Sequence, residues 1–114
     1  MADCTFCKIV SKESPSQMLF QDARVTAFRD IHPVAPTHVL IVPNKHIERA
    51  QDISAEDREL VGQLFYVARQ IAEQEGIAKN GYRLIINNGP HGGQVIYHLH
   101  LHLIGGAPMR YPMG

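Results

Sequence analysis

The chain has 114 residues, with 11 acidic and 11 basic side chains and 45% apolar residues. This length and composition predict one globular domain over residues 1–114 with a modest core. Because the net charge is zero, nucleic acid and the membrane surface are excluded as bulk partners. The first ten residues lack a signal-peptide pattern and no apolar run is long enough to span a bilayer, so a cytoplasmic location is expected.

Taken in chain order, the sequence predicts short strands in adjacent pairs with one long helix between them. Pro33 and Pro36 exclude regular structure over 31–37, because proline lacks an N–H donor and has a fixed backbone angle. The predicted elements are a short helical turn over 4–13, strands over 17–20, 24–30 and 38–43, a long helix after Ser54, and strands over 81–87 and 94–104. This order indicates an α+β fold with a mostly antiparallel sheet.

The long helix carries the clearest signals. Ser54 can cap its N-terminus together with Asp57 three residues later, and Gly76 can end it. Between these signals apolar residues recur at helical spacing, at Leu60, Val61, Leu64, Phe65, Ala68, Ile71 and Ala72.

The opening residues contain the only two cysteines, spaced as Cys4-x-x-Cys7. A thioredoxin-like redox pair would need a preceding strand, for which there is no room, and a disulfide is disfavoured in the cytoplasm. Half of a zinc site is a third interpretation, which requires two more ligands from elsewhere in the chain. The fourth interpretation is that the two cysteines are inert small residues. The spacing alone does not decide between half of a zinc site and two inert residues.

The last predicted strand, in QVIYHLHLHLIGG (residues 94–106), carries histidine at every second position. Because side chains alternate along a strand, His98, His100 and His102 are expected on one face. The other face, interpreted as the core side, carries Tyr97, Leu99, Leu101 and Leu103. Residues 98 and 102 of a strand lie about 13 Å apart, so one ion cannot bind all three imidazoles and at least one has a separate role.

The loop before this strand, NNGPHGGQ (residues 87–94), is rich in glycine. Glycine lets backbone N–H groups approach phosphate oxygens, although such residues alone are more often simple turn residues. Beside a row of imidazoles the loop indicates phosphorus chemistry, since a neutral imidazole nitrogen is a nucleophile and a neighbouring one can carry a proton. No Walker-type glycine-lysine motif is present, which excludes P-loop chemistry.

The chain resembles the histidine triad (HIT) family, in particular its Hint branch of nucleotide-binding proteins. His98-Leu-His100-Leu-His102-Leu matches the family signature of alternating histidines, each followed by a hydrophobic residue. Other matching blocks are AFRDIHPVAPTHVLIVPNKHI (27–47), GYRLIINNG (81–89), GGQVIYH (92–98) and IGGAPMRYP (104–112). The resemblance implies a HIT fold, with a five-stranded antiparallel sheet and one long and one short helix per subunit, assembled as a homodimer.

The resemblance also implies an activity, the hydrolysis of adenosine or guanosine 5′-monophosphoramidates. His100 would attack the α-phosphorus to form a nucleotidyl-histidine, which water would hydrolyse without a catalytic metal. His102 and His38 would assist at the phosphate, and His98 would orient the strand. The implied nucleotide contacts are Asp30 at the ribose, Phe6, Ile9, Phe28 and Ile31 around the base, Arg29 beside the base pocket, and Asn87, Gly93, Gln94 and Val95 near the phosphate and leaving group. For the four apolar residues, ordinary core packing is the alternative.

The resemblance also implies which residues complete the zinc site, because some bacterial members of the family hold zinc with the cysteine pair and two histidines. The corresponding residues here are Cys4, Cys7, His46 and His98.

Residues 105–114 form a tail whose glycines and prolines disfavour regular structure. The resemblance implies that this tail reaches the neighbouring subunit's pocket, where Tyr111 would influence leaving-group preference.

Three alternatives to this function stay open at the level of sequence. The first is a dinucleoside polyphosphate hydrolase of the Fhit type. The second is a nucleotide-binding or partner-binding scaffold without turnover. The third is a zinc protein with only a structural role, which would be favoured if His100 were a metal ligand.

Overall fold

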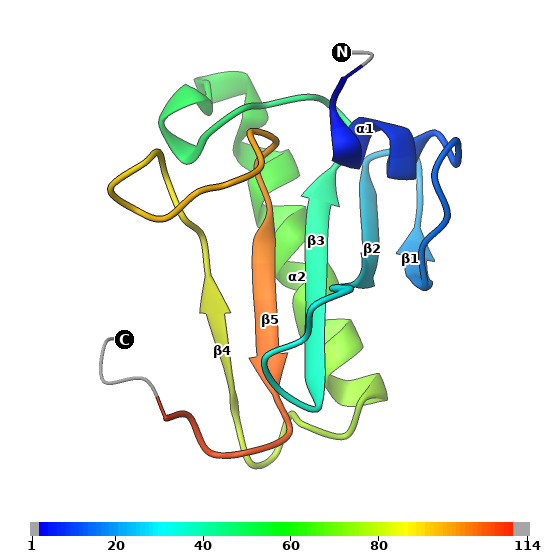
Figure 1. Cartoon of the computed structure of the whole chain (residues 1–114), viewed down its shortest axis with the longest axis vertical. Helices are drawn as coiled ribbons and strands as arrows, with labels where there is room; N and C mark the ends of the chain where they lie inside the picture. Colours follow the sequence, from blue (N-terminus) through cyan, green and yellow to red (C-terminus); the bar gives the residue numbers. More distant parts are fainter. Residues whose placement is uncertain (1–2, 111–114) are drawn as a thin grey trace.

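The computed structural model describes residues 3–110, so Tyr111 lies outside the described part of the chain. The elements are α1 (Thr5–Val10), β1 (Met18–Gln21), β2 (Val25–Arg29), β3 (Thr37–Pro43), 3-10 turns at Ala50–Asp52 and Ala55–Asp57, α2 (Arg58–Gln74), β4 (Tyr82–Ile85) and β5 (Leu101–Gly105). All five strands form one antiparallel sheet in the order β1-β2-β3-β5-β4 (Figure 1). The predicted α+β class is confirmed. Over residues 3–110, no helix has the length and apolar character needed to cross a membrane.

The long helix α2 covers one face of the sheet and forms the main core with it (Figure 1). The predicted N-terminal signal is confirmed, because Ser54 and Asp57 form a capping box in which the Ser54 N–H donates to Asp57 Oδ2 at 2.9 Å. All the residues at the predicted helical spacing lie in α2, although Phe65 is 42% exposed, whereas Val67 is fully buried. A helix turns 100° per residue, and the observed buried stripe is Leu60, Leu64, Val67, Ala68, Ile71 and Ala72.

The opposite face of the sheet carries a second, smaller apolar cluster beneath α1. Phe6 and Ile9 of α1 pack there against Phe28 of β2 and against Leu40 and Val42 of β3. Figure 1 shows α1 lying across the end of the sheet at which β3 finishes. Both faces of β2 and β3 are therefore covered at this end. All seven residues of β3, which lies between β2 and β5 in the sheet, are buried.

The last strand is shorter than predicted. It spans 101–105, and residues 94–100 lead into it without strand pairing. Their main chain bonds to loops instead, since Gln94 N–H donates to Gly89 O at 3.0 Å and Leu99 N–H donates to Ile47 O at 2.6 Å. Leu99, Leu101 and Leu103 reach the core as expected. The prediction for Tyr97 is wrong, because its side chain is 38% exposed outside the regular strand.

Candidate active site and metal centre

A cavity of about 550 Å³ opens on the face of the sheet that α1 partly covers. Its volume lies within the range of small-molecule sites, and its wall is mostly apolar with a few polar groups. Most of the predicted nucleotide contacts line it, namely Phe6, Ile9, Phe28, Arg29, Asp30, Ile31, Asn87, Gly93, Val95, His100 and His102, together with His38. The fold thus brings together residues that are up to 96 positions apart in the chain, from Phe6 to His102.

The three alternating histidines have three different environments. His98 is fully buried beside the two cysteines, His100 lines the cavity, and His102 lies against His38 of β3. The expectation that one site cannot hold all three imidazoles is confirmed by these separate partners. Each imidazole therefore has different hydrogen-bond partners, and these partners determine its tautomer.

The hydrogen bond of His100 fixes the position of its proton. His100 Nδ1 lies 2.8 Å from the carbonyl oxygen of His98, and a carbonyl oxygen can only accept. Nδ1 must therefore carry the hydrogen, which leaves the lone pair of the neutral ring on Nε2. Burial lowers the pKa of this imidazole below its ordinary value, so the neutral form is favoured. His100 Nε2 thus has the electronic state that a nucleophile needs.

The His38–His102 pair can be assigned in the same way. The Val34 N–H donates to His38 Nδ1 at 3.2 Å, so the hydrogen of the neutral His38 ring is on Nε2. His38 Nε2 lies 2.9 Å from His102 Nδ1, which must then accept. The hydrogen of His102 is consequently on Nε2, where it is available to donate to a ligand. Asp30 Oδ2 lies 3.3 Å from His38 Nε2 and supports the same tautomer.

Phe6 forms the part of the cavity wall that adjoins His100. Its ring meets the His100 ring edge-on, with centroids 5.1 Å apart, and meets Phe28 in the same way at 5.4 Å. Ile31 and Val95 lie at the mouth of the cavity and are 83% and 85% exposed. The cavity therefore combines a buried aromatic wall with an exposed apolar rim, an arrangement suited to a flat ring.

The buried histidines make stability depend on pH. The pKa of His102 is lowered to about 4, first by burial and then by the neighbouring His100 and His38. Because the unfolded imidazole has a pKa near 6.5, the unfolded chain binds more protons between about pH 6.5 and pH 4. We expect the free energy of unfolding to fall as the pH is lowered through this window. Urea titrations at several pH values test this, and His102→Asn should reduce the slope; an unchanged slope would contradict the assignment.

Two predicted nucleotide residues have side chains that are engaged elsewhere. Arg29 lines the rim of the cavity, but its guanidinium donates to both carboxylate oxygens of Glu75, each at 2.9 Å. Gln94 is buried and does not line the cavity. Its Oε1 accepts from Gly89 N at 2.9 Å, and its Nε2 donates to the carbonyl oxygens of Glu48 and Ile96. A phosphate contact through either side chain stays a prediction.

The three hydrogen bonds of Gln94 predict a structural effect when the side chain is removed. Gln94→Ala leaves a buried N–H and two carbonyl groups without these partners, and we expect a loss of about 2–4 kcal/mol in the free energy of unfolding. Urea unfolding measures this loss. Gln74→Ala is the matched control, because Gln74 is exposed on α2, and it should change stability by less than about 0.5 kcal/mol. Equal effects of the two variants would contradict the bridging role of Gln94.

Several lining residues were missed from the sequence. The missed lining residues are Leu40, His32, Val34, Ile96, Thr5, Pro15 and Ser16. The alternation of β3 carried a usable signal for Leu40, because residue 40 lies on the same strand face as His38. All the others except Thr5, the first residue of α1, lie in irregular segments, for which no periodicity applies.

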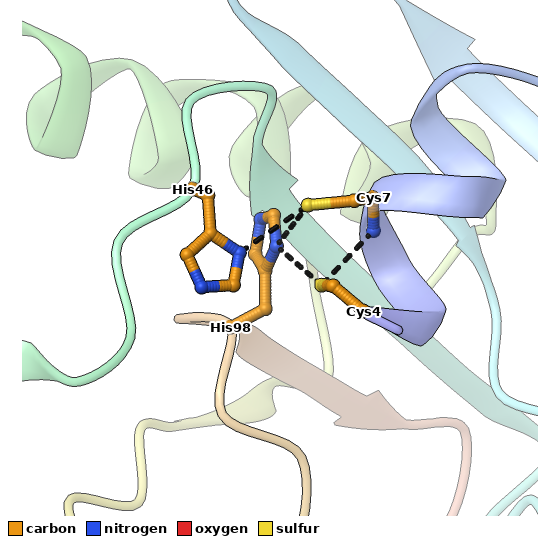
Figure 2. A group of neighbouring side chains, drawn as sticks. All are labelled: Cys4, Cys7, His46 and His98. Atoms are coloured by element: carbon orange, nitrogen blue, oxygen red, sulfur yellow. Dashed lines mark hydrogen bonds between the residues drawn. The ribbon is translucent and has the colours of Figure 1, made fainter. Parts of the chain in front are cut away.

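A second group of side chains brings the cysteine pair to two histidines. Figure 2 shows Cys4 and Cys7 at α1 facing His46, which follows β3, and His98, which precedes β5. One ligand atom from each of the four lies within 4.8 Å of the others. Cys7 Sγ is 3.2 Å from His46 Nδ1, and Cys4 Sγ is 3.3 Å from His98 Nδ1. The predicted set is therefore assembled in one place.

The donor geometry fits a tetrahedral zinc ion. With Zn–S bonds of about 2.3 Å and Zn–N bonds of about 2.0 Å, neighbouring ligand atoms are separated by about 3.3–3.8 Å. The observed sulfur–nitrogen distances of 3.2–3.5 Å are close to this range. His98 Nε2 donates to the Pro43 carbonyl oxygen at 2.8 Å, which leaves the lone pair on Nδ1 facing the sulfurs. A metal-binding histidine commonly has such a second partner.

The alternative of a redox pair is disfavoured by the surroundings of Cys7. Desolvation by burial, followed by the Cys4 side chain, raises the pKa of the Cys7 thiol to about 11. Reactive Cys-x-x-Cys pairs need a lowered thiol pKa, since the thiolate is the attacking species. A bound cation supplies the charge that makes thiolates favourable at this position.

Comparison with known proteins shows a match along nearly the whole chain. Residues 11–109 match the model of the HIT domain. The chain is 56% identical over 104 residues to the purine nucleoside phosphoramidase of Escherichia coli (strain K12), covering 91% of this chain and 87% of that protein. It is 49% identical over 111 residues to the 14 kDa zinc-binding protein of Zea mays, covering 96% and 86%. Among solved structures, the HIT family hydrolase of Legionella pneumophila Philadelphia 1 superimposes with a TM-score of 0.95 at 46% identity, covering 98% of this chain and 100% of that one.

Proposed function

The chain belongs to the HIT-domain family, and from this premise we infer that it is a purine-nucleotide hydrolase of the Hint type, a nucleoside phosphoramidase. Its reaction cleaves the P–N bond of adenosine or guanosine 5′-monophosphoramidates. The observation that carries this proposal is the hydrogen bond from His100 Nδ1–H to the carbonyl of His98, because it leaves a nucleophilic Nε2 in a nucleotide-sized cavity. The 56% identity to a purine nucleoside phosphoramidase supports the substrate class.

We assign the first chemical step to His100. Its Nε2 lone pair forms a bond to the α-phosphorus while the bond from phosphorus to the amine nitrogen breaks, and the leaving nitrogen takes up a proton from water in the open cavity. His102 Nε2–H donates to the phosphoryl oxygens and is held in that tautomer by His38 and Asp30. Preorganised donors of this kind stabilise the charge that develops on the phosphoryl group.

The second step returns the enzyme to its starting state. Water attacks the phosphorus and gives up a proton to solvent, the bond to His100 Nε2 breaks, and the nucleoside monophosphate leaves with the former water oxygen. Asp30 has acceptor capacity left beyond its contacts with His38 and the His32 N–H, which suits it to the ribose hydroxyls. The base would lie between the aromatic wall at Phe6 and Phe28 and the exposed Ile31.

Turnover of two substrates tests the proposal. We expect the protein to release AMP from an adenosine 5′-phosphoramidate of a simple amine much faster than from diadenosine triphosphate. Preference for diadenosine triphosphate would reassign it to the Fhit-type hydrolases. Binding of AMP without turnover of either compound would make it a nucleotide-binding scaffold.

We further propose that Cys4, Cys7, His46 and His98 bind one structural zinc ion. The sulfur–nitrogen distances and the orientation of His98 support this, and a maize relative is named a zinc-binding protein. When bound, the ion would cross-link α1 to the segment after β3, which carries His46, and to the segment before β5, which carries His98. The catalytic roles assigned above need no metal. Two free cysteines in one ligand set suit a reducing compartment, and a cytoplasmic location is part of the proposal.

We propose a homodimer, in line with the resemblance. β4 forms one edge of the sheet, so its outer main-chain groups are placed to pair with a second copy. A cavity of about 560 Å³ that contains none of the triad histidines lies beside this strand and is lined by Arg83, Ile85 and residues 107–110. Sedimentation equilibrium at micromolar concentration distinguishes dimer from monomer.

Deletion of residues 107–114 tests whether the tail influences leaving-group preference. The deletion should change the ranking of activities among phosphoramidates of different amines.

A further inference from the structure

The short helix α1 contributes to two sites at once. Cys4 and Cys7 lie three residues apart and face the histidines of the metal centre. Phe6 and Ile9, also three apart, line the nucleotide cavity from the same six-residue helix. Because residues three or four apart share a helix face, each site uses one side of the same helix. A change in the position of α1 would therefore reach both sites.

α1 depends on other parts of the protein for its position. A helix of six residues does not persist on its own in water. Its contacts include the apolar cluster beneath it, the sulfur–imidazole contacts to His46 and His98, and a hydrogen bond from Gln21 Nε2 of β1 to the Val10 carbonyl oxygen at 3.0 Å. Residue 46 follows β3 and residue 98 precedes β5, so these imidazoles lie at the end of the sheet where β3 finishes. An ion shared by all four ligands would fix α1 to that end.

His98 provides a further connection between the metal centre and the nucleophile. Its ring faces the cysteine sulfurs, and its carbonyl oxygen accepts the hydrogen bond that sets the His100 tautomer. The Phe6 ring lies between the two, edge-on to His98 at 6.1 Å and to His100 at 5.1 Å between centroids. Phe6 therefore contacts an imidazole from each site.

We propose that the metal centre and the nucleotide cavity are thermodynamically linked, with α1 and its Phe6 as the connecting element. Zinc would hold Phe6 and Ile9 where the base binds, and a bound purine nucleotide would hold Cys4 and Cys7 where zinc binds. This makes Cys4, Cys7 and His46 positioning residues for a site that they do not touch. The inference rests on the proposed nucleotide and zinc sites and adds the coupling between them.

Thermodynamic linkage between the two sites has a consequence that does not follow from a zinc ion with a purely structural role. If zinc raises the affinity for AMP by some factor, AMP must raise the affinity for zinc by the same factor. Couplings between ligand sites in proteins are typically about 5–150-fold, and we expect at least about fivefold here. As long as the zinc-stripped chain stays folded, a zinc ion that only stabilised the fold would be held equally well with and without nucleotide in the cavity.

The main experiment uses the zinc-loaded protein. The affinity for zinc is measured by competition with a chromogenic chelator, with and without saturating AMP. We expect AMP to tighten zinc binding at least about fivefold. Calorimetric titration of AMP into loaded and zinc-stripped protein should give the same factor, with circular dichroism reporting the fold of the stripped form. Equal zinc affinities in the presence and absence of AMP would overturn the coupling while leaving the proposed function intact.

Phe6→Ala tests whether α1 carries the coupling. This variant keeps all four metal ligands, so it should still bind zinc, but the effect of saturating AMP on zinc affinity should approach one. An unchanged ratio in Phe6→Ala would overturn the role given to α1. Failure of the parent to bind zinc would also overturn the proposal, whereas failure of the zinc-loaded parent to bind AMP would instead remove the proposed function.

Discussion

Replacement of His100 by alanine is expected to reduce phosphoramidase activity on the order of 10⁴-fold or more, the scale seen when a covalent nucleophile is removed. The reason is that, within residues 3–110, no other side chain combines a lone pair, a fixed tautomer and a place in the cavity wall as His100 Nε2 does. His102 cannot replace it, because its own Nε2 carries the hydrogen and its Nδ1 accepts from His38. Release of AMP from an adenosine phosphoramidate at saturating substrate measures the loss.

The controls for this variant separate chemistry from folding. His100→Ala should bind AMP within a few-fold of the parent, as measured by calorimetry, because the base and ribose contacts lie on other residues. His91→Ala is the matched histidine control, since His91 is exposed in the glycine-rich loop and does not line the cavity, and it should keep full activity. A His100→Ala protein that turned over substrate within a few-fold of the parent would refute the assignment of the nucleophile.

Removal of zinc is expected to produce the largest change in stability. Protein purified without chelator should contain close to one zinc per chain by metal analysis. An ion bound only by the folded state stabilises it by about 4 kcal/mol when its concentration is 1,000 times the dissociation constant. We therefore expect a chelator to lower the free energy of unfolding by an amount of this order, because α1 would lose its attachment to His46 and His98.

Substitution of a ligand gives an independent check of the zinc site. Cys7→Ser should abolish bound zinc and make stability insensitive to the chelator. Ser11→Ala, an exposed substitution just beyond α1, should leave both properties as in the parent. A parent protein with no bound metal and with both thiols freely reactive would remove the zinc site from the account.

Elements with a strong periodic pattern could be predicted from the sequence. The Ser54–Asp57 cap and the apolar spacing locate the long helix, although the observed buried stripe of α2 lacks Val61 and Phe65 and includes Val67. The strand over 94–104 was overestimated for a physical reason. Alternation of His98, Leu99 and His100 fits a strand, but the Leu99 N–H bonds to Ile47 in a loop rather than to β3. A pattern of side chains does not identify the partner of a backbone group.

The site could be predicted as a set of residues but not as a network. Alternation and the family resemblance identified His100, His102, His38 and Asp30, and all four line one cavity. The tautomers depend on a carbonyl and an N–H that carry no side-chain signal, those of His98 and Val34. The ion pair of Arg29 with Glu75 could not be predicted either, because Glu75 lies at the end of α2, 46 residues away in the sequence. The Arg29–Glu75 contact arises only when α2 packs on the sheet.

The proposed mechanism requires a covalent bond between His100 Nε2 and the α-phosphorus. Rapid mixing with an adenosine phosphoramidate, quenching within one turnover and peptide mass spectrometry detect this bond. We expect an added mass of one adenylyl group on the peptide that contains His100, localised to that residue and absent from His100→Ala. An adenylyl group on His102 or His38, or complete turnover with no adduct at any time, would refute the mechanism.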